Sequence, residues 1–233
     1  MKVISFSLYG SNPMYTIGCI RNAELKKIHF PDWEMWVYYN DTVPQEIIEQ
    51  LINLDVKLIK KDTNHGYINS MWRFLPMNEE NLEYYICRDC DSRISERDVI
   101  AVTEWIESGK NFHIIRDHPI GHWWAMNAGM WGAKGNTILN FRDIINDYLR
   151  VNFRTHDKAI DQHFLRDIVY PYTINNCLVH DEYYNHESYA KPINHDRKSN
   201  NFAFIGEAIQ GDDEPAGDQR TPIIEIYNKK NKI

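Results

Sequence analysis

Hydrophobic positions along this chain change their spacing in a way that predicts a layered fold. Ile4, Phe6 and Leu8 recur at every second residue, which predicts a β-strand over 3–8. From 14 to 29 the apolar residues recur at helical spacing instead. The same reasoning predicts further strands at 33–39, 56–59, from 84, at 112–115 and at 176–179, and helices from Pro44 and at 70–77, 95–109, 137–149 and 158–168. This order predicts an α/β fold, a single Rossmann-like domain with a mostly parallel central sheet flanked by helices.

The hydrophobic pattern weakens after about position 181. Prolines appear, and an acidic stretch follows at 211–215. We therefore expect a core over 1–181 and a C-terminal tail over 182–233 that packs on the core and could act as a lid. The segment 201–205 is the expected docking strand of this tail.

Two carboxylates, Asp89 and Asp91, stand in the turn after the strand that begins at Tyr84. In extended chain, residues i and i+2 point to the same side, so both can face one point while Cys90 faces away. Two carboxylates aimed at one point repel each other unless a cation lies between them, and oxygen-only ligands suit Mg²⁺ or Mn²⁺. The C-terminal end of a strand is also where open α/β sheets bind ligands. An Asp after a strand is also a common turn residue, so a structural role is the alternative.

Composition narrows the class of protein. The chain has 233 residues, a formal net charge of -7 and 13% aromatic residues. A general nucleic-acid binder would usually be basic, so that class is disfavoured. The start does not resemble a signal peptide, and no apolar run approaches the roughly 18 residues of a membrane span, so we expect a soluble cytoplasmic protein. Cys87 and Cys90 form a C-x-x-C at a strand end, where neither a redox motif nor a zinc half-site is expected.

Several short segments together carry a family resemblance. They are C-R-D-C-D-S-R at 87–93, E-W-I at 104–106, F-H-I-I-R-D-H-P at 112–119, G-M-W-G at 129–132 and D-Q-H-F-L at 161–165. In this order they resemble the small GT-A-fold glycosyltransferases of large algal DNA viruses and bacterial surface-polysaccharide clusters. The resemblance covers most of the chain, from the first strand to 204–206, and each segment alone is a weak signal.

The resemblance implies a GT-A domain that uses a nucleotide-sugar donor, most often UDP-linked, with Mn²⁺ or Mg²⁺. It implies that Asp89 and Asp91 hold the metal, with His180 as the third ligand. It further implies hexosyl or deoxyhexosyl transfer to a glycan or glycoprotein acceptor, in the host cytoplasm if the protein is virus-encoded.

The expected nucleotide site lies around these carboxylates. The loop of the first strand would hold the base, with Tyr9 stacking on it, and arginines would bind phosphate oxygens with their planar fork. The nucleotide-binding candidates are Ser7, Leu8, Tyr9, Arg21, Trp72, Arg73, Arg88 and Asp89. For each arginine the alternative is a surface ion pair, and for Trp72 it is core packing.

Candidates for the sugar and acceptor side come from the middle of the chain. They are Asp117, His118, Trp124 and Asn127, whereas Trp123 and Trp131 are expected in the core. His118 and His122 have a zinc-like spacing, but Pro119 and Gly121 break the helix that this spacing needs.

Asp161 is the candidate catalytic carboxylate, either as the base of an inverting enzyme or as a residue that stabilises charge at the anomeric carbon of a retaining one. The alternative for Asp161 is a helix N-terminal carboxylate. Glu207, Asp212 and Asp213 are rival carboxylates in the tail.

Glycosyl transfer, which the resemblance implies, fits these residues, because a divalent ion on both phosphates neutralises the charge that develops on the leaving diphosphate. Two other classes stay open. One is a metal-dependent nucleotidyl- or phosphotransferase, although no Walker-type P-loop is present. A nucleotidyltransferase would release pyrophosphate instead of nucleoside diphosphate. A non-catalytic sugar-binding module of the same fold would bind its ligand without metal.

Overall fold

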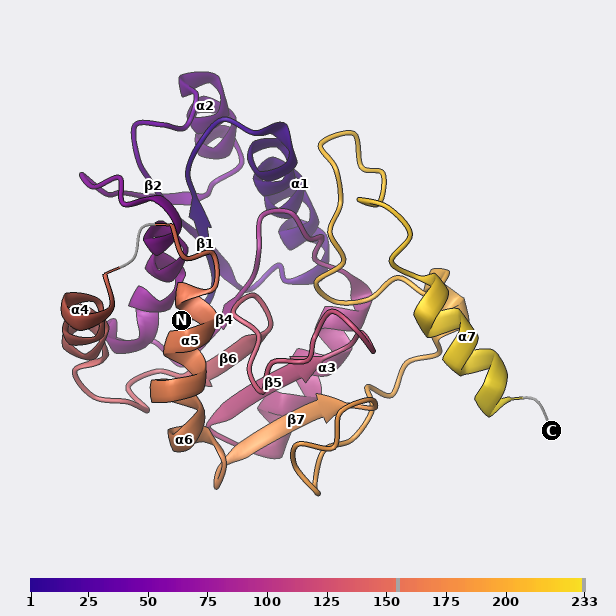
Figure 1. The fold of residues 1–233 in the computed structure, drawn as a ribbon. Helices are drawn as coiled ribbons and strands as arrows, with labels where there is room; N and C mark the ends of the chain where they lie inside the picture. The colour runs from indigo at the N-terminus through magenta and orange to yellow at the C-terminus, as the bar shows by residue number, and fades with distance from the viewer. Residues whose placement is uncertain (154–155, 232–233) are drawn as a thin grey trace.

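The computed structural model describes residues 1–153 and 156–231. Within them one seven-stranded sheet has the order β3-β2-β1-β4-β6-β5-β7 (Figure 1). Its strands are β1 (Lys2–Leu8), β2 (Glu34–Tyr39), β3 (Lys57–Lys60), β4 (Tyr84–Cys87), β5 (Phe112–Arg116), β6 (Trp131–Lys134) and β7 (Cys177–Asp181). Only β6 runs antiparallel to its neighbours. The expected α/β fold with a mostly parallel sheet is confirmed.

Helices cover both faces of the sheet because the strands bury alternate residues on each side. One face packs on α1 (Pro13–His29), α2 (Gln45–Asn53) and α3 (Glu96–Ser108). The side chains of Ile4, Phe6 and Leu8 lie on this face and pack against these helices. The other face packs on the 3₁₀ helix η1 (Gly66–Asn78), on α4 (Phe141–Asn152), and on a continuous helical run that joins α5 (Ile160–Phe164), η2 (Leu165–Val169) and α6 (Tyr170–Thr173). The core therefore has an apolar layer on each face of the sheet.

Strand β6 was not expected from the sequence, because its four residues include a glycine and show no clear alternation. The reason for the glycine is steric. A Cβ on Gly132 would lie 2.8 Å from the backbone oxygen of Tyr85 on the neighbouring strand. A side chain is therefore excluded at a position where the sheet needs close packing.

Helix α4 begins at Phe141, four residues later than the helix expected from Thr137. Asn136 and Asn140 have φ values of 57° and 55°, so the chain turns twice through the left-handed region before the helix starts. Asparagine tolerates this conformation better than most residues.

The C-terminal segment differs most from expectation. No strand forms over 201–205, and the chain instead continues through turns after η3 (Arg197–Asn200). Phe204 and Ile205 are nevertheless buried against the core. The unexpected helix α7 (Thr221–Lys230) follows, and Figure 1 shows it beyond the yellow loop that lies beside α1. No helix in the described part of the chain is long and apolar enough to cross a membrane.

Candidate active site

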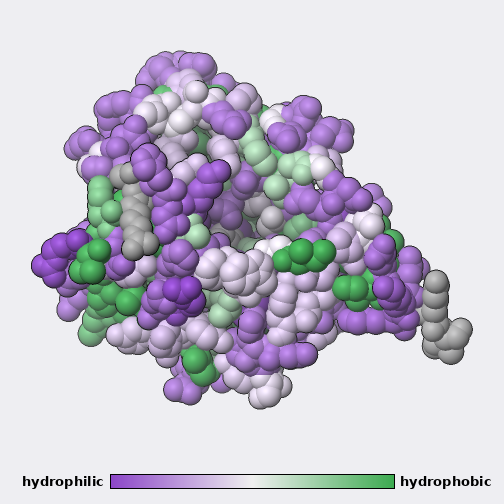
Figure 2. Space-filling view, in the orientation of Figure 1, coloured by the Kyte–Doolittle hydropathy of each residue, from purple (hydrophilic) through white to green (hydrophobic). Residues whose placement is uncertain are grey.

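A cavity of about 390 Å³ opens at the C-terminal ends of β1 and β4. These adjacent parallel strands mark the point where the chain order reverses, because β1 leads to β2 on one side and pairs with β4 on the other. Ligands bind at such a point in open α/β sheets. The lining residues are Ser7, Tyr9, Tyr15, Tyr67, Ser70, Arg73, Asp89, Cys90, Asp91, Lys158, Asp161, Gln162 and Gly206. Figure 2 shows this face hollowed near its centre, where α5 lies beside β1 and β4 in Figure 1.

Arg73 joins two of the cavity's carboxylates. Its guanidinium donates one hydrogen bond to Asp89 and another, 2.7 Å long, to Oδ2 of Asp161. Its backbone N–H donates to the hydroxyl of Ser7 at 2.9 Å, and that hydroxyl donates to the Ser70 carbonyl at 3.0 Å. Burial alone would lower the pKa of Arg73, but Asp89 and Asp161 raise it, so the guanidinium stays charged. Arg73 thereby fixes carboxylates from β4 and α5 in one place.

The turn with Asp89 and Asp91 is held between two glycines. A Cβ on Gly129 would lie 1.8 Å from Oδ2 of Asp89, and a Cβ on Gly18 would lie 2.0 Å from the Cys90 carbonyl oxygen. Both positions therefore need a residue without a side chain. The Asp91 carbonyl accepts a 2.7 Å bond from the Ile209 N–H, which attaches the C-terminal segment to this turn.

The two carboxylates repel each other. Burial, and then the charge of Asp89, raise the pKa of Asp91 to about 7. A cation between them would relieve this repulsion. The side chains of Asp89 and Asp91 suit a divalent metal, because both offer only oxygen atoms, the ligands that Mg²⁺ and Mn²⁺ prefer. The described residues contain no group of three or more His, Cys, Asp or Glu that could hold a metal, so further ligands would have to come from substrate or water.

His180 does not join this site, and its expected role as third metal ligand is wrong. It is a fully buried residue of β7, at the edge of the sheet beyond β6 and β5. One ring nitrogen lies 2.8 Å from His113 Nε2, and the other lies 2.8 Å from the Glu104 carboxylate. With both nitrogens engaged, neither is available to a metal. The sequence places His180 at a strand end but does not show which strand lies next to β4.

The structure brings together Ser7, Tyr9, Arg73, Asp89, Asp91 and Asp161 from the sequence-predicted set. Tyr9 is half-buried and meets Trp72 edge to face, with ring centroids 6.2 Å apart. Burial raises the pKa of Tyr9, so its hydroxyl stays protonated. Trp72 itself is buried beneath this ring, which corresponds to the core-packing alternative.

Three nucleotide candidates lie away from the cavity, and their expected role is not supported. Leu8 is fully buried on the opposite face of the sheet. Arg88 is buried and donates to the capping-box residue Asp98 at 2.8 Å. Arg21 lies on the surface of α1 and pairs with Glu24 and Asp213, both at 2.9 Å. Both arginines therefore make structural ion pairs.

The expected acceptor residues Asp117, His118 and Asn127 are used to hold loops, so their predicted role needs correction. The Asp117 carboxylate accepts two hydrogen bonds from the Arg97 guanidinium, both 2.8 Å long, and one of 2.7 Å from Arg197. Although burial opposes it, these arginines hold the pKa of Asp117 below its ordinary value. His118 Nε2 lies 2.7 Å from the Gln219 carbonyl, and the Asn127 amide donates to the His122 carbonyl at 3.4 Å.

The tryptophans divide differently from expectation. Trp131 is in the core, as expected, but Trp123 is 56% exposed, so its expected core position is wrong. Trp123 stacks on Trp124 with ring centroids 4.3 Å apart. Trp124 in turn meets His163, which follows the cavity residues Asp161 and Gln162 in the chain. The pair thus contacts the helix that carries Asp161, although neither tryptophan is among the residues that line the cavity.

Sequence reasoning missed several cavity residues, namely Tyr15, Tyr67, Ser70, Lys158, Gln162 and Gly206. Gln162 offered one signal, since it follows Asp161 directly, and its side-chain oxygen accepts the Ala128 N–H at 3.1 Å. The others come from loops and helix starts whose position depends on the whole fold.

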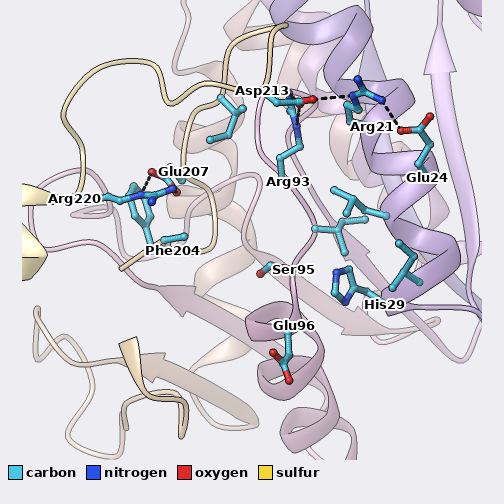
Figure 3. Close-up of a pocket in the computed structure, with 15 residues that line it drawn as sticks. Arg21, Glu24, His29, Arg93, Ser95, Glu96, Phe204, Glu207, Asp213 and Arg220 are labelled. Carbon is cyan, nitrogen blue, oxygen red and sulfur yellow. Dashed lines mark hydrogen bonds and ion pairs between the residues drawn. The ribbon is translucent and has the colours of Figure 1, made fainter. Parts of the chain in front are cut away.

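A larger cavity, of about 570 Å³, lies on the other side of the 89–95 turn (Figure 3). Its wall includes Ile28 and Ile94, and most of its charged side chains form ion pairs. Asp213 binds both Arg21 and Arg93, and Arg220 binds Glu207. The tail carboxylates Glu207 and Asp213 therefore lie in this cavity rather than beside Asp89, and the Asp212 carboxylate accepts the Glu214 N–H in a nearby turn.

Comparisons with known proteins show similar solved structures only. No protein-family model and no curated protein matches the chain. Among solved structures, TarS of S. aureus in complex with UDP is 15% identical, with a TM-score of 0.47 over 78% of this chain and 59% of that one. Mannosyltransferase PcManGT from Pyrobaculum calidifontis, in complex with GDP-Man and Mn²⁺, is 12% identical, with a TM-score of 0.44 over 70% of this chain and 50% of that one.

A glycosyltransferase involved in the glycosylation of the major capsid of PBCV-1 is 14% identical, with a TM-score of 0.44 over 77% of this chain and 80% of that one. The chain thus spans 50–59% of the length of the first two proteins. These identities and TM-scores describe a general likeness of fold, so function has to be argued from the cavity.

Proposed function

We propose that this protein is a metal-dependent glycosyltransferase that moves a sugar from a nucleoside diphosphate donor to a glycan acceptor. We expect the nucleotide of the donor to be UDP. The observation that carries the proposal is the acidic cavity at the switch point of the sheet. There Arg73 holds Asp89 and Asp161 together, and Asp91 lines the same cavity, where burial and the charge of Asp89 raise its pKa. Such a site suits a substrate that brings phosphates and a cation with it.

The donor end of the cavity would be built by β1 and β4. Asp89 and Asp91 would hold Mn²⁺ or Mg²⁺, and the ion would act as a Lewis acid on the leaving diphosphate. Tyr9 offers a half-buried ring to the nucleobase, and Tyr15 and Tyr67 add two more rings to the wall. The Arg73 guanidinium keeps the Asp89 carboxylate in place before any ligand arrives.

Asp161 is the residue placed to act on the sugar. It is buried, and burial raises its pKa while Arg73 lowers it. A carboxylate fixed in this way can stabilise positive charge at the anomeric carbon, or accept the proton of an acceptor hydroxyl. The two roles correspond to retention and inversion of stereochemistry.

The acceptor side would be the loop with Trp123 and Trp124. A stacked indole pair offers an apolar surface to the C–H face of a sugar. Trp124 was expected on this side from the sequence, and its ring contacts His163, which lies two residues after Asp161 in the chain.

Product analysis with Asp161→Asn tests the proposal. The protein is incubated with UDP- and GDP-sugars and Mn²⁺, and released nucleoside diphosphate is measured. We expect the variant to lose release by ~10² to 10³-fold, the scale of a catalytic carboxylate, and to keep nucleotide binding. Asp167→Asn, an exposed carboxylate on the same helical run, is the matched control and should leave release unchanged.

Other products would contradict the proposal. Pyrophosphate in place of nucleoside diphosphate would indicate nucleotidyl transfer. Sugar binding without any product and without metal dependence would indicate a binding module.

A further inference from the structure

The charges that line the acidic cavity are not balanced. Three carboxylates, Asp89, Asp91 and Asp161, face two cations, Arg73 and Lys158, among the described lining residues. Arg73 is already engaged, because its two terminal nitrogens bind Asp89 and Asp161. Lys158 has no hydrogen bond or ion pair among the described residues. It is the one cation in the described lining that remains free to bind an incoming anion.

The structure holds the backbone of Lys158 in a defined turn. The Asp157 carboxylate accepts the Ala159 N–H at 3.0 Å and lies 3.2 Å from His163 Nδ1. The Lys158 ammonium lies over the ring of Tyr67, 5.5 Å from its centroid. Tyr67 is also a lining residue, so Lys158 and Tyr67 face each other from α5's leading turn and the start of η1 at the cavity.

A cation–π contact with a partly exposed tyrosine is weak. An ammonium–phosphate contact is stronger, because both groups are charged. Lys158 can therefore leave the Tyr67 ring for a phosphate oxygen at low cost. A divalent ion at Asp89 and Asp91 would cover one side of a diphosphate, and Lys158 is available for the other.

We propose that Lys158 is a diphosphate-binding residue of this cavity, which selects ligands by their phosphate charge. The inference rests on the proposed function and deepens it, since it names a specificity determinant for the donor. During glycosyl transfer an acceptor hydroxyl oxygen forms the new bond to the anomeric carbon and gives its proton to a carboxylate, for which Asp161 is the candidate. The bond between the anomeric carbon and the diphosphate oxygen breaks, and its electron pair leaves with the oxygen of the nucleoside diphosphate. The Lys158 ammonium would stabilise the negative charge that develops there, without giving up its proton.

The test compares binding of three probes by isothermal titration calorimetry in the presence of Mn²⁺: inorganic pyrophosphate, UDP and uridine. Lys158→Met removes the charge and keeps most of the length of the side chain. We expect it to bind pyrophosphate and UDP about tenfold more weakly, the scale of one charge-assisted contact, and to bind uridine as the wild type does. Lys158→Arg should restore most of the affinity, because a cation returns to the position.

Lys198→Met is the matched control. Lys198 is exposed and lies over Tyr227 at 5.2 Å, almost the same contact, but it lies in η3 and not in this cavity's lining. It should leave all three affinities unchanged, and thermal melts of each variant confirm folding.

The outcomes separate the two levels of the proposal. Equal affinities of wild type and Lys158→Met for pyrophosphate and UDP would overturn the role of Lys158 and leave the proposed function intact. Wild type that binds pyrophosphate through Lys158 but no nucleoside diphosphate would keep this inference and reject the proposed donor. Wild type that binds neither anion would overturn both.

Discussion

The acidic cavity beside Asp89 and the larger cavity beside α1 share a wall but differ in how deeply their ion pairs are buried. Both are lined by the 89–95 turn and by the segment 203–209. In the larger cavity Arg21 and Arg93 bind Asp213, and Arg220 binds Glu207 (Figure 3). In the smaller cavity one arginine serves two carboxylates and a third, Asp91, is left with a raised pKa. The comparison teaches that buried carboxylates that share one cation at a strand end indicate a site better than volume does.

The largest effect should follow from removing Arg73. Arg73→Met leaves Asp89 and Asp161 without their shared cation in a buried place. Breaking a buried ion pair from one side costs about 3–5 kcal/mol, so we expect a marked fall in stability in chemical denaturation. Arg21→Met, which removes the partner of Glu24 and Asp213 in the larger cavity, serves as control and should cost clearly less, because both of its ion pairs are exposed. Equal losses would remove the distinction between the two cavities.

Acid should weaken the wall that the cavities share. Burial lowers the pKa of His122 to about 3, and its ring packs on Phe204 in that wall. The groups that face it are Asp117, His118, Arg197 and Asp181. The unfolded chain has the ordinary histidine pKa of about 6.5 and binds the proton first, so stability is complete above 6.5 and falls as pH decreases toward 3.

The expected loss is about 1.4 kcal/mol per pH unit for one such histidine. Urea midpoints at pH 7.5 and 5.0 measure it, and His122→Asn, which can keep an acceptor for the Asp117 N–H, should show a smaller difference. Identical midpoints at both pH values in the wild type would contradict the prediction.

A glycine substitution should affect the smaller cavity selectively. In Gly129→Ala the new Cβ would overlap the Asp89 carboxylate and push it from Arg73. We expect Mn²⁺ affinity to fall at least tenfold, roughly the effect of misplacing one ligand. Gly109→Ala, at the end of α3 with open space around it, should lower stability through its φ of 70° and leave Mn²⁺ affinity unchanged. A metal titration that cannot distinguish the two variants would argue against the Asp89 site.

The smallest effect should come from the larger cavity. Asp213→Asn weakens partly exposed ion pairs to Arg21 and Arg93, which contribute about 0–1 kcal/mol. The affinity for nucleotide should stay within about twofold of the wild-type value, because the loss of such a weak, exposed ion pair changes the structure of the acidic cavity little. A large loss of nucleotide affinity in this variant would show that the two cavities work as one site.

The sequence was informative where local pattern decides the outcome. The alternation of Ile4, Phe6 and Leu8 predicted a strand that the structure confirms as β1, and the helix predicted over 95–109 is confirmed as α3. The position of Asp89 and Asp91 after a buried strand was also predictable, because strand ends and turns have local signals. These features depend on a few neighbouring residues, so one chain is enough to see them.

The remaining site depended on long-range packing. Asp89 follows strand β4, and His180 lies near the end of β7. Two strands, β6 and β5, separate β4 from β7 in the sheet, and no local signal in the sequence shows that order. The sequence gives no sign that Arg88 and Arg73 have different roles. Arg88 pairs with Asp98 in the N-terminal capping box of α3, whereas Arg73 reaches the cavity from η1. Lys158 enters the lining only because the start of α5 folds over Tyr67.

Calorimetric titration of UDP, GDP and CMP, with and without Mn²⁺, into the wild type and Asp91→Asn tests the central claim most directly. The account predicts that one nucleotide binds with metal, and that the variant, in which an amide replaces the carboxylate, loses at least about tenfold in affinity. Absence of nucleotide binding, or binding that Mn²⁺ does not change, would contradict it and would favour a sugar-binding module of the same fold.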